Sequence, residues 1–595
     1  MSQKLENQLN LALEMTEELR EQTGDLSVGY DRQEKTWELI VKYNGAADQL
    51  RDALGPRALV EPLIAGFGII TVPESLVDAL ATNPQIEYVE KPKNFYYVQE
   101  GPAARACIAG VIARDPFLSG KGILLAIIDS GIAYWRKEFR DSFGRTRIRF
   151  FWDQTLKSGD YEDLPGPPEG FFEGAEFDAA SIDHALNAET EAERFERLPT
   201  IDVTGHGTAV AGIAAASRIG EYQGVAANAD LMIVKLGGGG GALAGYSKTT
   251  EIMRAVTYCV RKAMDLGKPL VINLSFGNTY GAHDGSSLLE RFLDNASEIG
   301  RTVICVGSGN EGNSSGHVRG NVLTRRTVDL TIADPEPSLS IQLWKDYCDQ
   351  FRVTLRSPGG SAVNLLPERL DGSGGGYMLR LDNTRILVYF GEPTPYSVSQ
   401  EIYLELLPAQ EGAYLPAGIW QLRLEPVRIV TGAYDLYLPP EVTRNRGTAF
   451  LEPTPEGTLT IPSTASKVIT VGAYDEQYES YADFSGRGYA SEAGVRSHPG
   501  IKPDLAAPGV NVLAPNVYGG YSYVAGTSFS TPIVSGSVAL LMEWGIRQGN
   551  DPFLYGEKVK AYLRGGALPI RGESVYPNAK VGFGAVCVSE SIPKE

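Results

Sequence analysis

The sequence has no apolar run approaching the ~20 residues needed to span a membrane. Its first residues also lack the basic-then-apolar order of a secretory signal. We therefore expect no membrane span and no signal peptide, with the chain cytoplasmic at synthesis.

Cysteine and histidine are scarce, with five of each, and neither type shows close pairing or metal-ligand spacing. A disulfide scaffold or structural zinc site is therefore not expected, and we predict a reduced chain without a metal or cofactor. Basic residues are also in deficit, because 54 Lys and Arg stand against 73 Asp and Glu, a net charge of −19. This acidity argues against binding nucleic acid through a basic face.

Glycine, in contrast, is abundant, with 67 of 595 residues, above the average share of roughly 7%. The chain therefore needs many tight turns or close backbone approaches. Its apolar fraction of 43% and charged fraction of 21% are those of a soluble globular protein. The length predicts three or four folded units.

The first unit spans residues 28–92 and alternates strand and helix patterns in the order βαββαβ, a split-βαβ unit. From about residue 120, four short apolar runs predict buried strands, at 123–128, 231–236, 270–274 and 303–306. Helical patterns near 249–265 and 286–299 separate the later runs. This order predicts a parallel, doubly wound sheet of the α/β class. Residues 136–201 form an irregular, charged stretch with a helix near 181–197.

Residues 321–455 break this alternation. Eight strand patterns occur there without helix patterns, at 328–333, 339–345, 351–356, 377–381, 386–390, 402–407, 420–424 and 434–438. An all-β sandwich or jelly roll fits best. Because the α/β pattern resumes after residue 456, this β unit is predicted to be inserted within the α/β domain.

Three separated positions carry reactive side chains. Asp129 ends a buried strand, where open α/β sheets place their sites, although taken alone a simple strand-ending turn explains it better. His206 lies between two glycines at the start of a small-residue helix, which is also compatible with a simple capping turn. Ser528 begins an apolar helix, where N–H groups favour negative charge or where serine acts only as a cap. Together they follow the order Asp, His, Ser of subtilisin-type proteases.

The resemblance becomes specific at the surrounding residues. Three segments resemble the signature motifs of the subtilase family of serine endopeptidases: Asp129-Ser130-Gly131, His206-Gly207-Thr208 and Gly526-Thr527-Ser528-Phe529-Ser530-Thr531-Pro532. Three more are similar to subtilase segments, namely the oxyanion segment 306–312, the pocket strand 272–277 and the stretch 502–509 before the serine.

The resemblance implies a subtilisin-like fold and a role for each matching residue. Asp129 would orient His206, which would take the proton of Ser528 as it attacks the scissile carbonyl. Asn310 would donate to the oxyanion. The substrate-binding residues would be Ser275, Phe276, Gly277, Gly307, Ser308 and Gly309.

Two departures from the family pattern are small. Ala209 stands where many subtilases have a second histidine, with little consequence expected for the triad. The segment 216–226 has few oxygen ligands, so the calcium loop of secreted subtilases is not expected.

The glycine run 237–241 is not followed by Gly-Lys-Ser/Thr, so it does not predict a phosphate loop. It falls where subtilases bind substrate backbone, or it is a plain flexible loop.

The βαββαβ unit resembles a subtilase propeptide of ferredoxin-like fold, an inhibitor and folding chaperone. A propeptide without a signal peptide, together with an inserted β unit, resembles the Csp germination proteases of clostridial spores. This likeness implies a propeptide retained in the active site after one autocatalytic cut between Phe95 and Gly101, in the region Phe95, Tyr96, Tyr97, Val98 and Gln99. The predicted domains are 1–97 (propeptide), 98–320 and 456–595 (catalytic) and 321–455 (inserted jelly roll).

The implied activity is limited proteolysis of a protein precursor, such as a spore cortex-lytic pro-enzyme, by a monomeric, spore-associated enzyme. Two alternatives stay open: a leaderless general endopeptidase, and a non-catalytic germination regulator. The intact set of catalytic residues disfavours the regulator.

Overall fold

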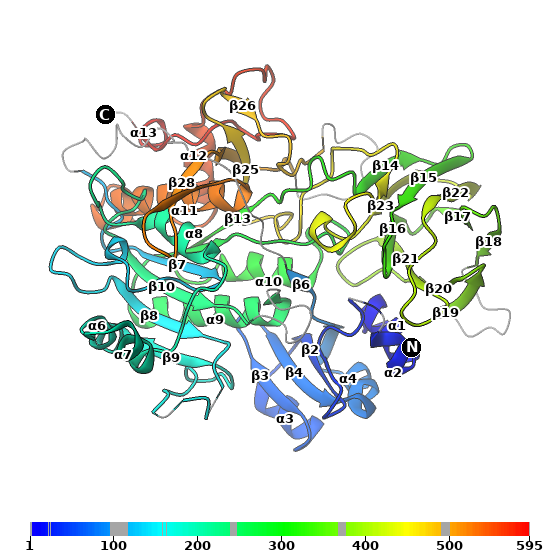
Figure 1. Ribbon diagram of the computed structural model, residues 1–595, viewed down its shortest axis with the longest axis horizontal. Helices are drawn as coiled ribbons and strands as arrows, with labels where there is room; N and C mark the ends of the chain where they lie inside the picture. Colours follow the sequence, from blue (N-terminus) through cyan, green and yellow to red (C-terminus); the bar gives the residue numbers. More distant parts are fainter. Residues whose placement is uncertain are drawn as a thin grey trace.

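The structure is a computed structural model that describes residues 3–21, 23, 25–95, 117–157, 159–161, 163–237, 247–366, 376–489 and 500–593. Figure 1 shows three parts: an amino-terminal unit in blue, an α/β unit around a central sheet, and a β unit in green and yellow. Strands on both sides of the β unit in sequence belong to the central sheet, so the β unit is an insertion in the α/β unit.

The amino-terminal unit is an antiparallel sheet with short helices. Its elements are α1 (Asn7–Glu14), α2 (Glu17–Glu21), β1 (Tyr30–Asp31), β2 (Thr36–Tyr43), α3 (Ala47–Leu54), β3 (Leu59–Pro62), β4 (Phe67–Pro73), α4 (Val77–Thr82) and β5 (Ile86–Glu90). Strand β2 pairs with β1, β4 and β5, and β4 pairs with β3. From β2 to β5 the element order is the predicted βαββαβ.

Side chains alternate between the two faces of the sheet along β2, and both faces are buried. Leu39 and Val41 pack in a core shared with α3 and α4. Ile40, between them, packs in a different core together with Ile252 and Phe292 of the α/β unit. The amino-terminal unit is therefore docked on the α/β unit through one whole sheet face.

The α/β unit has a mainly parallel sheet in the order β26-β25-β13-β12-β7-β10-β8-β9, with β27 paired to β25. Its strands are β7 (Leu124–Asp129), β8 (Ile148–Asp153), β9 (Ala175–Asp178), β10 (Asp230–Lys235), β12 (Leu270–Leu274), β13 (Thr302–Gly307), β25 (Ile469–Asp475), β26 (Ser480–Tyr481) and β27 (Leu505–Val510). Only β9 and β26 pair antiparallel within it. The four predicted apolar runs lie at β7, β10, β12 and β13.

Helices cover the two faces of this sheet. Leu125 and Ile127 of β7 pack in the core that contains α8 (His206–Ala215) and α11 (Thr527–Met542). Leu124, Ala126 and Ile128 pack in the core of α9 (Thr249–Asp265) and α10 (Leu288–Ala296). A continuous apolar strand thus feeds two cores, as predicted for a doubly wound sheet.

The stretch 136–201 is more regular than its sequence indicated. It contributes β8 and β9 to the sheet edge, and the single helix expected near 181–197 is two helices, α6 (Ala179–Leu186) and α7 (Glu191–Arg197). Strand β8 escaped detection because charged residues precede it and its burial is mixed.

The inserted β unit consists of two antiparallel sheets around one core. One sheet has the order β14-β23-β16-β21-β20-β19, and the other β18-β17-β22-β15-β24. The strands are β14 (His317–Asn321), β15 (Arg326–Ile332), β16 (Leu339–Asp346), β17 (Gln350–Arg356), β18 (Ala362–Leu365), β19 (Gly376–Leu381), β20 (Thr384–Phe390), β21 (Ser399–Pro408), β22 (Gly418–Arg428), β23 (Ala433–Tyr437) and β24 (Ala449–Phe450). All eight predicted strands overlap one of these.

Among the described residues, Cys259, Cys305 and Cys348 are free, whereas Cys587 forms a disulfide, so the expectation of a fully reduced chain is wrong at that cysteine.

One helical stretch of the described chain, Thr527–Arg547, is long and apolar enough to cross a membrane, but 89% of its apolar window is buried in the protein. It is the central helix of the α/β core.

Candidate active site

Asp129 and His206 form a buried pair at the carboxyl edge of the central sheet. The His206 ring nitrogen Nδ1 lies 2.7 Å from Oδ1 of Asp129, and each side chain is 1% exposed. Asp129 is the last residue of β7, and His206 is the first residue of α8. Gly205, just before the helix, has φ of 77°, a conformation that glycine adopts without strain. The local backbone therefore brings the imidazole onto the strand end.

A second carboxylate, Asp202, ties these two segments together. Its Oδ1 accepts hydrogen bonds from the Ser130 hydroxyl (2.8 Å) and the Gly205 N–H (2.9 Å). Its Oδ2 accepts from the backbone N–H (2.8 Å) and the hydroxyl (2.7 Å) of Thr208. Asp202 thus fixes the start of α8 relative to the loop after Asp129. In the sequence it is only an aspartate four residues before the histidine, and nothing around it marks this role.

Ser528 lies in the first turn of α11, beside this pair. The ring of His206 is 5.3 Å from that of Phe529, the residue next to Ser528. The Ser528 hydroxyl donates to the backbone oxygen of Ser275 (2.9 Å), and the Ser275 hydroxyl donates to the backbone oxygen of Ser528 (2.9 Å). Because a hydroxyl has a single hydrogen, Ser528 must release Ser275 before it can donate to the imidazole.

Asn310 is held against the same helix start. Its Oδ1 accepts from the backbone N–H and from the hydroxyl of Thr527, both at 3.0 Å. The Oδ1 side of the amide is thereby fixed, which leaves its NH₂ group as the donor for a ligand. The first-turn N–H of Ser528 is a second donor, since such groups have no partner within their helix.

A small pocket of about 30 Å³ joins these groups. The residues that line it include Ser528 and Asn310, and five of the predicted substrate-binding residues: Ser275, Phe276, Gly277, Gly307 and Gly309. Ser308 departs from the prediction, because it is fully buried with its hydroxyl 3.2 Å from that of Ser485. Successive side chains of an extended segment point to opposite sides, so Ser308 faces away between two pocket glycines.

Sequence reasoning missed Thr460, Glu311, Pro440 and Val442, which also line this pocket. Thr460 lies between two glycines: a Cβ placed on Gly277 or Gly309 would come within 2.4 Å of its side chain. Its buried hydroxyl has no hydrogen-bond partner among the described residues. The two glycine segments gave a signal in the sequence, but Thr460 follows the insertion and has no motif of its own.

The amino-terminal unit runs into this site as an added strand. Strand β6 (Asn94–Phe95) pairs antiparallel with β11 (Ser247–Lys248), just before α9. The side-chain amide of Asn278 donates to the backbone oxygen of Asn94 (3.1 Å). Asn278 follows the pocket residue Gly277, so the strand leads toward the pocket. Of the predicted cleavage region, Tyr96, Tyr97, Val98 and Gln99 lie outside the described residues, as does most of the glycine run 237–241.

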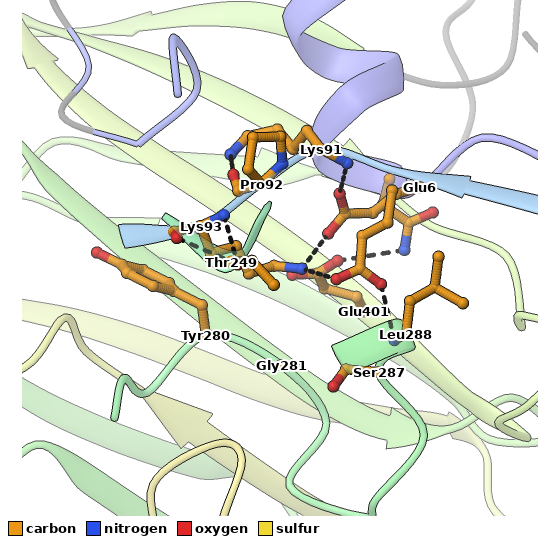
Figure 2. A network of polar contacts seen from close by, with 12 residues as sticks. Glu6, Lys91, Pro92, Lys93, Thr249, Tyr280, Gly281, Ser287, Leu288 and Glu401 are labelled. Atoms are coloured by element: carbon orange, nitrogen blue, oxygen red, sulfur yellow. Dashed lines mark hydrogen bonds and ion pairs between the residues drawn. The ribbon is translucent and has the colours of Figure 1, made fainter. Parts of the chain in front are cut away.

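A buried charge cluster holds the residues just before this strand. Lys93 Nζ lies 2.8 Å from Oε1 of Glu6 and 2.6 Å from Oε1 of Glu90, as Figure 2 shows for the network. Glu90 Oε2 also accepts from the Leu288 N–H (3.1 Å) of the α/β unit. Beside them, Glu401 of the β unit accepts from the Asn7 amide (3.2 Å), and burial raises the pKa of Glu401 to about 7. All three parts of the chain therefore meet at this cluster.

Two family models match most of the chain. The family model described as "Csp protease B prodomain" matches residues 3–93, and the model described as "Subtilase family" matches residues 120–337 and 445–584. The chain is similar to the solved structure of the Clostridium perfringens CspB protease, with 34% identity and a TM-score of 0.72 over 82% of this chain and 95% of that one.

Two curated proteases of Bacillus subtilis (strain 168) are also similar to parts of the chain. The minor extracellular protease Vpr is 24% identical over 510 residues, which is 81% of this chain and 52% of Vpr. The serine protease AprX is 33% identical over 150 residues, 23% of this chain and 32% of AprX. The chain thus spans about half the length of Vpr and a third of AprX.

Proposed function

The chain belongs to the subtilase family of serine endopeptidases and carries an amino-terminal prodomain, and we propose that Asp129, His206 and Ser528 are its catalytic triad. The observation that carries the proposal is the 2.7 Å pair of Asp129 and His206, whose imidazole ring contacts Phe529, the residue next to Ser528 at the helix start. A carboxylate-held imidazole next to such a serine supplies the groups that acyl transfer needs.

The mechanism uses each of these groups in turn. Ser528 releases the Ser275 carbonyl, gives its proton to Nε2 of His206 and attacks the scissile carbonyl. The Asn310 amide and the Ser528 N–H stabilise the resulting oxyanion. The imidazolium, stabilised by Asp129, then gives its proton to the leaving amine as the peptide bond breaks. Water, activated by His206, hydrolyses the acyl-enzyme and restores Ser528.

The first substrate in this proposal is the chain itself. A single cut between Phe95 and Gly101 would separate the prodomain, with Phe95, Tyr96, Tyr97, Val98 and Gln99 as the candidate positions. Support comes from the pairing of β6 with β11, which directs this segment toward the pocket. The packing of the amino-terminal sheet on α9 and α10 supports retention of the prodomain after the cut.

For the physiological substrate, we propose a protein precursor activated by limited proteolysis, such as a spore cortex-lytic pro-enzyme. The similarity to the CspB protease over 95% of that chain supports this class of activity. Synthesis in the cytoplasm, association with the spore and a monomeric state belong to the same proposal. For the inserted β unit we propose a jelly-roll topology, supported by two antiparallel sheets around one core.

The test is labelling by a serine-reactive fluorophosphonate, combined with cleavage of a peptide mixture. Wild type should be labelled on Ser528 and should cut peptides, whereas Ser528→Ala should do neither. Ser537→Ala is the matched control, since Ser537 is a buried serine of the same helix whose hydroxyl donates to the Ile533 carbonyl of that helix. Wild-type protein without labelling and without cutting would favour the non-catalytic regulator instead.

A further inference from the structure

The segment that leaves the β unit after β23 returns along the candidate pocket. In Figure 1 this yellow segment lies between the β unit and the α/β unit. It begins at Leu438, whose N–H donates to the Gly316 carbonyl (2.9 Å) and whose carbonyl accepts from the Thr279 hydroxyl (2.7 Å). Both partners belong to loops that follow pocket strands, so the path of the segment is set beside the pocket.

Two further anchors fix the rest of this return segment, residues 438–444. The Glu441 N–H points between the carboxylate oxygens of Glu311, at 3.3 and 3.4 Å. The guanidinium of Arg444 donates to the Ser314 carbonyl (2.7 Å). Glu311 directly follows Asn310, the candidate oxyanion donor. The return segment is therefore attached to the same loop that carries part of the catalytic machinery.

Pro440 and Val442, on either side of the anchored Glu441, line the pocket. The other residues that line the pocket include Phe276, Gly277, Gly307 and Gly309 of the α/β unit. Val442 is 50% exposed, which is the expected state for a side chain at a pocket mouth. One wall of the pocket is thus apolar and comes from the β unit rather than from the catalytic domain.

This wall lies outside the residues that the subtilase family model matches, which end at 337 and resume at 445. Resting on the protease function proposed above, we propose that the inserted β unit forms one wall of the primary specificity pocket and that Val442 limits the size of the substrate side chain bound there. That side chain belongs to the P1 residue, whose carbonyl is attacked.

Cleavage-site profiling tests this inference. Processed wild type, Val442→Ala, Val442→Phe and Val430→Ala are incubated with one mixture of proteome-derived peptides, and new termini are identified by mass spectrometry. Val430, 63% exposed in the same β unit and absent from the pocket lining, is the matched control. Because Val442 is half-exposed, neither substitution at this position disturbs a core.

The expected result is a change of about tenfold in the ratio of kcat/KM for large over small P1 side chains, the size typical of one or two methyl groups in a pocket. Val442→Ala should raise the ratio, Val442→Phe should lower it, and Val430→Ala should leave it unchanged. Identical profiles for all four active enzymes would overturn the inference and leave the protease function intact. Absence of cutting by wild type would overturn the protease function and this inference with it.

Discussion

Ser528 and Ser275 exchange two hydrogen bonds, each hydroxyl donating to the other residue's backbone oxygen at 2.9 Å. This exchange joins the start of α11 to the end of β12 and holds the candidate nucleophile away from transfer to His206. Ser275 is held in turn, because its hydroxyl accepts from the Asn273 amide (2.8 Å). The Ser528 hydroxyl therefore starts in an orientation that donates to Ser275 and not to His206. It belongs to a network of buried hydrogen bonds that links Asn273, Ser275 and Ser528.

Replacing Ser275 by Ala should break this hydrogen-bond network and destabilise the protein. The Asn273 amide loses its acceptor and the buried Ser528 carbonyl loses a donor, so we expect the free energy of unfolding to fall by about 1–3 kcal/mol. The measurement is chemical denaturation of the Ser275→Ala and Ser528→Ala double variant against Ser528→Ala alone, so that no autoprocessing intervenes. A midpoint equal to that of the single variant would show that the exchange contributes no stability.

Replacing Asn310 by Ala should remove the proposed side-chain oxyanion donor. Loss of one such donor lowers kcat by about 10² to 10³, while KM changes little because the ground-state carbonyl is bound less tightly than the oxyanion. Steady-state kinetics on a cleavable peptide measure both constants. Asn550→Ala, an exposed site remote from the pocket, is the control. A rise in KM at unchanged kcat would assign Asn310 to substrate binding instead.

Replacing Asp202 by Asn should disturb the positioning of His206. The carboxylate accepts five hydrogen bonds, and the NH₂ group of asparagine would face a donor where Oδ1 or Oδ2 now accepts. We expect kcat to fall at least tenfold and KM to change by a smaller factor, because a misplaced base affects the chemical step most. Unaltered kinetics with reduced thermal stability would show that Asp202 only supports the fold.

Retention of the cleaved prodomain should depend on pH through Glu401. Burial raises the pKa of Glu401 from 4.5 to about 7 and, in the same strand, that of Glu405 to about 8. In the docked state these carboxyls keep protons that an exposed carboxyl releases, so docking is strongest at low pH and weakens as pH rises from 4.5 toward 7. Burial also lowers the pKa of Lys91 to about 8, which acts only above that pH.

Size-exclusion chromatography of processed protein measures this dependence. The fraction of prodomain that elutes with the catalytic part should fall from about pH 5 to about pH 7.5, with a limit of tenfold in the dissociation constant per pH unit and group. Glu401→Gln should flatten the dependence, whereas Glu452→Gln, at an exposed site, should keep it. Equal retention at both pH values in wild type would exclude the buried carboxyls as its cause.

The parts of the fold that follow a local pattern could be predicted from the sequence. The apolar run of β7 predicted a buried strand, and the motifs around Asp129 and His206 predicted their pairing through the family resemblance. Strand β8 could not be predicted, because charged residues precede and begin it and only its last residues form an apolar, buried segment. The π-helical extension of α11, Glu543–Arg547, had no sequence signal either.

The candidate site shows the same division. Asp129, His206, Ser528 and Asn310 lie in short motifs with distinct chemistry, and the structure brings all four to one edge of the sheet. Val442 and Thr460 come to the pocket through tertiary contacts that span the insertion, and nothing in their neighbouring residues marks them. The prediction that Ser308 lines the pocket is wrong. A motif gives the order of residues, whereas the side to which each side chain points depends on the backbone.

Self-cleavage by Ser528 is the step on which the proposed function depends. Intact-mass measurement of freshly purified wild type and Ser528→Ala tests it most directly. We expect wild type to separate under denaturing conditions into a fragment of about 10 kDa, the size of a small domain, and a remainder whose new amino terminus lies between residues 96 and 101. Ser528→Ala should stay whole. An uncut wild type, or the same cut in Ser528→Ala, would contradict it.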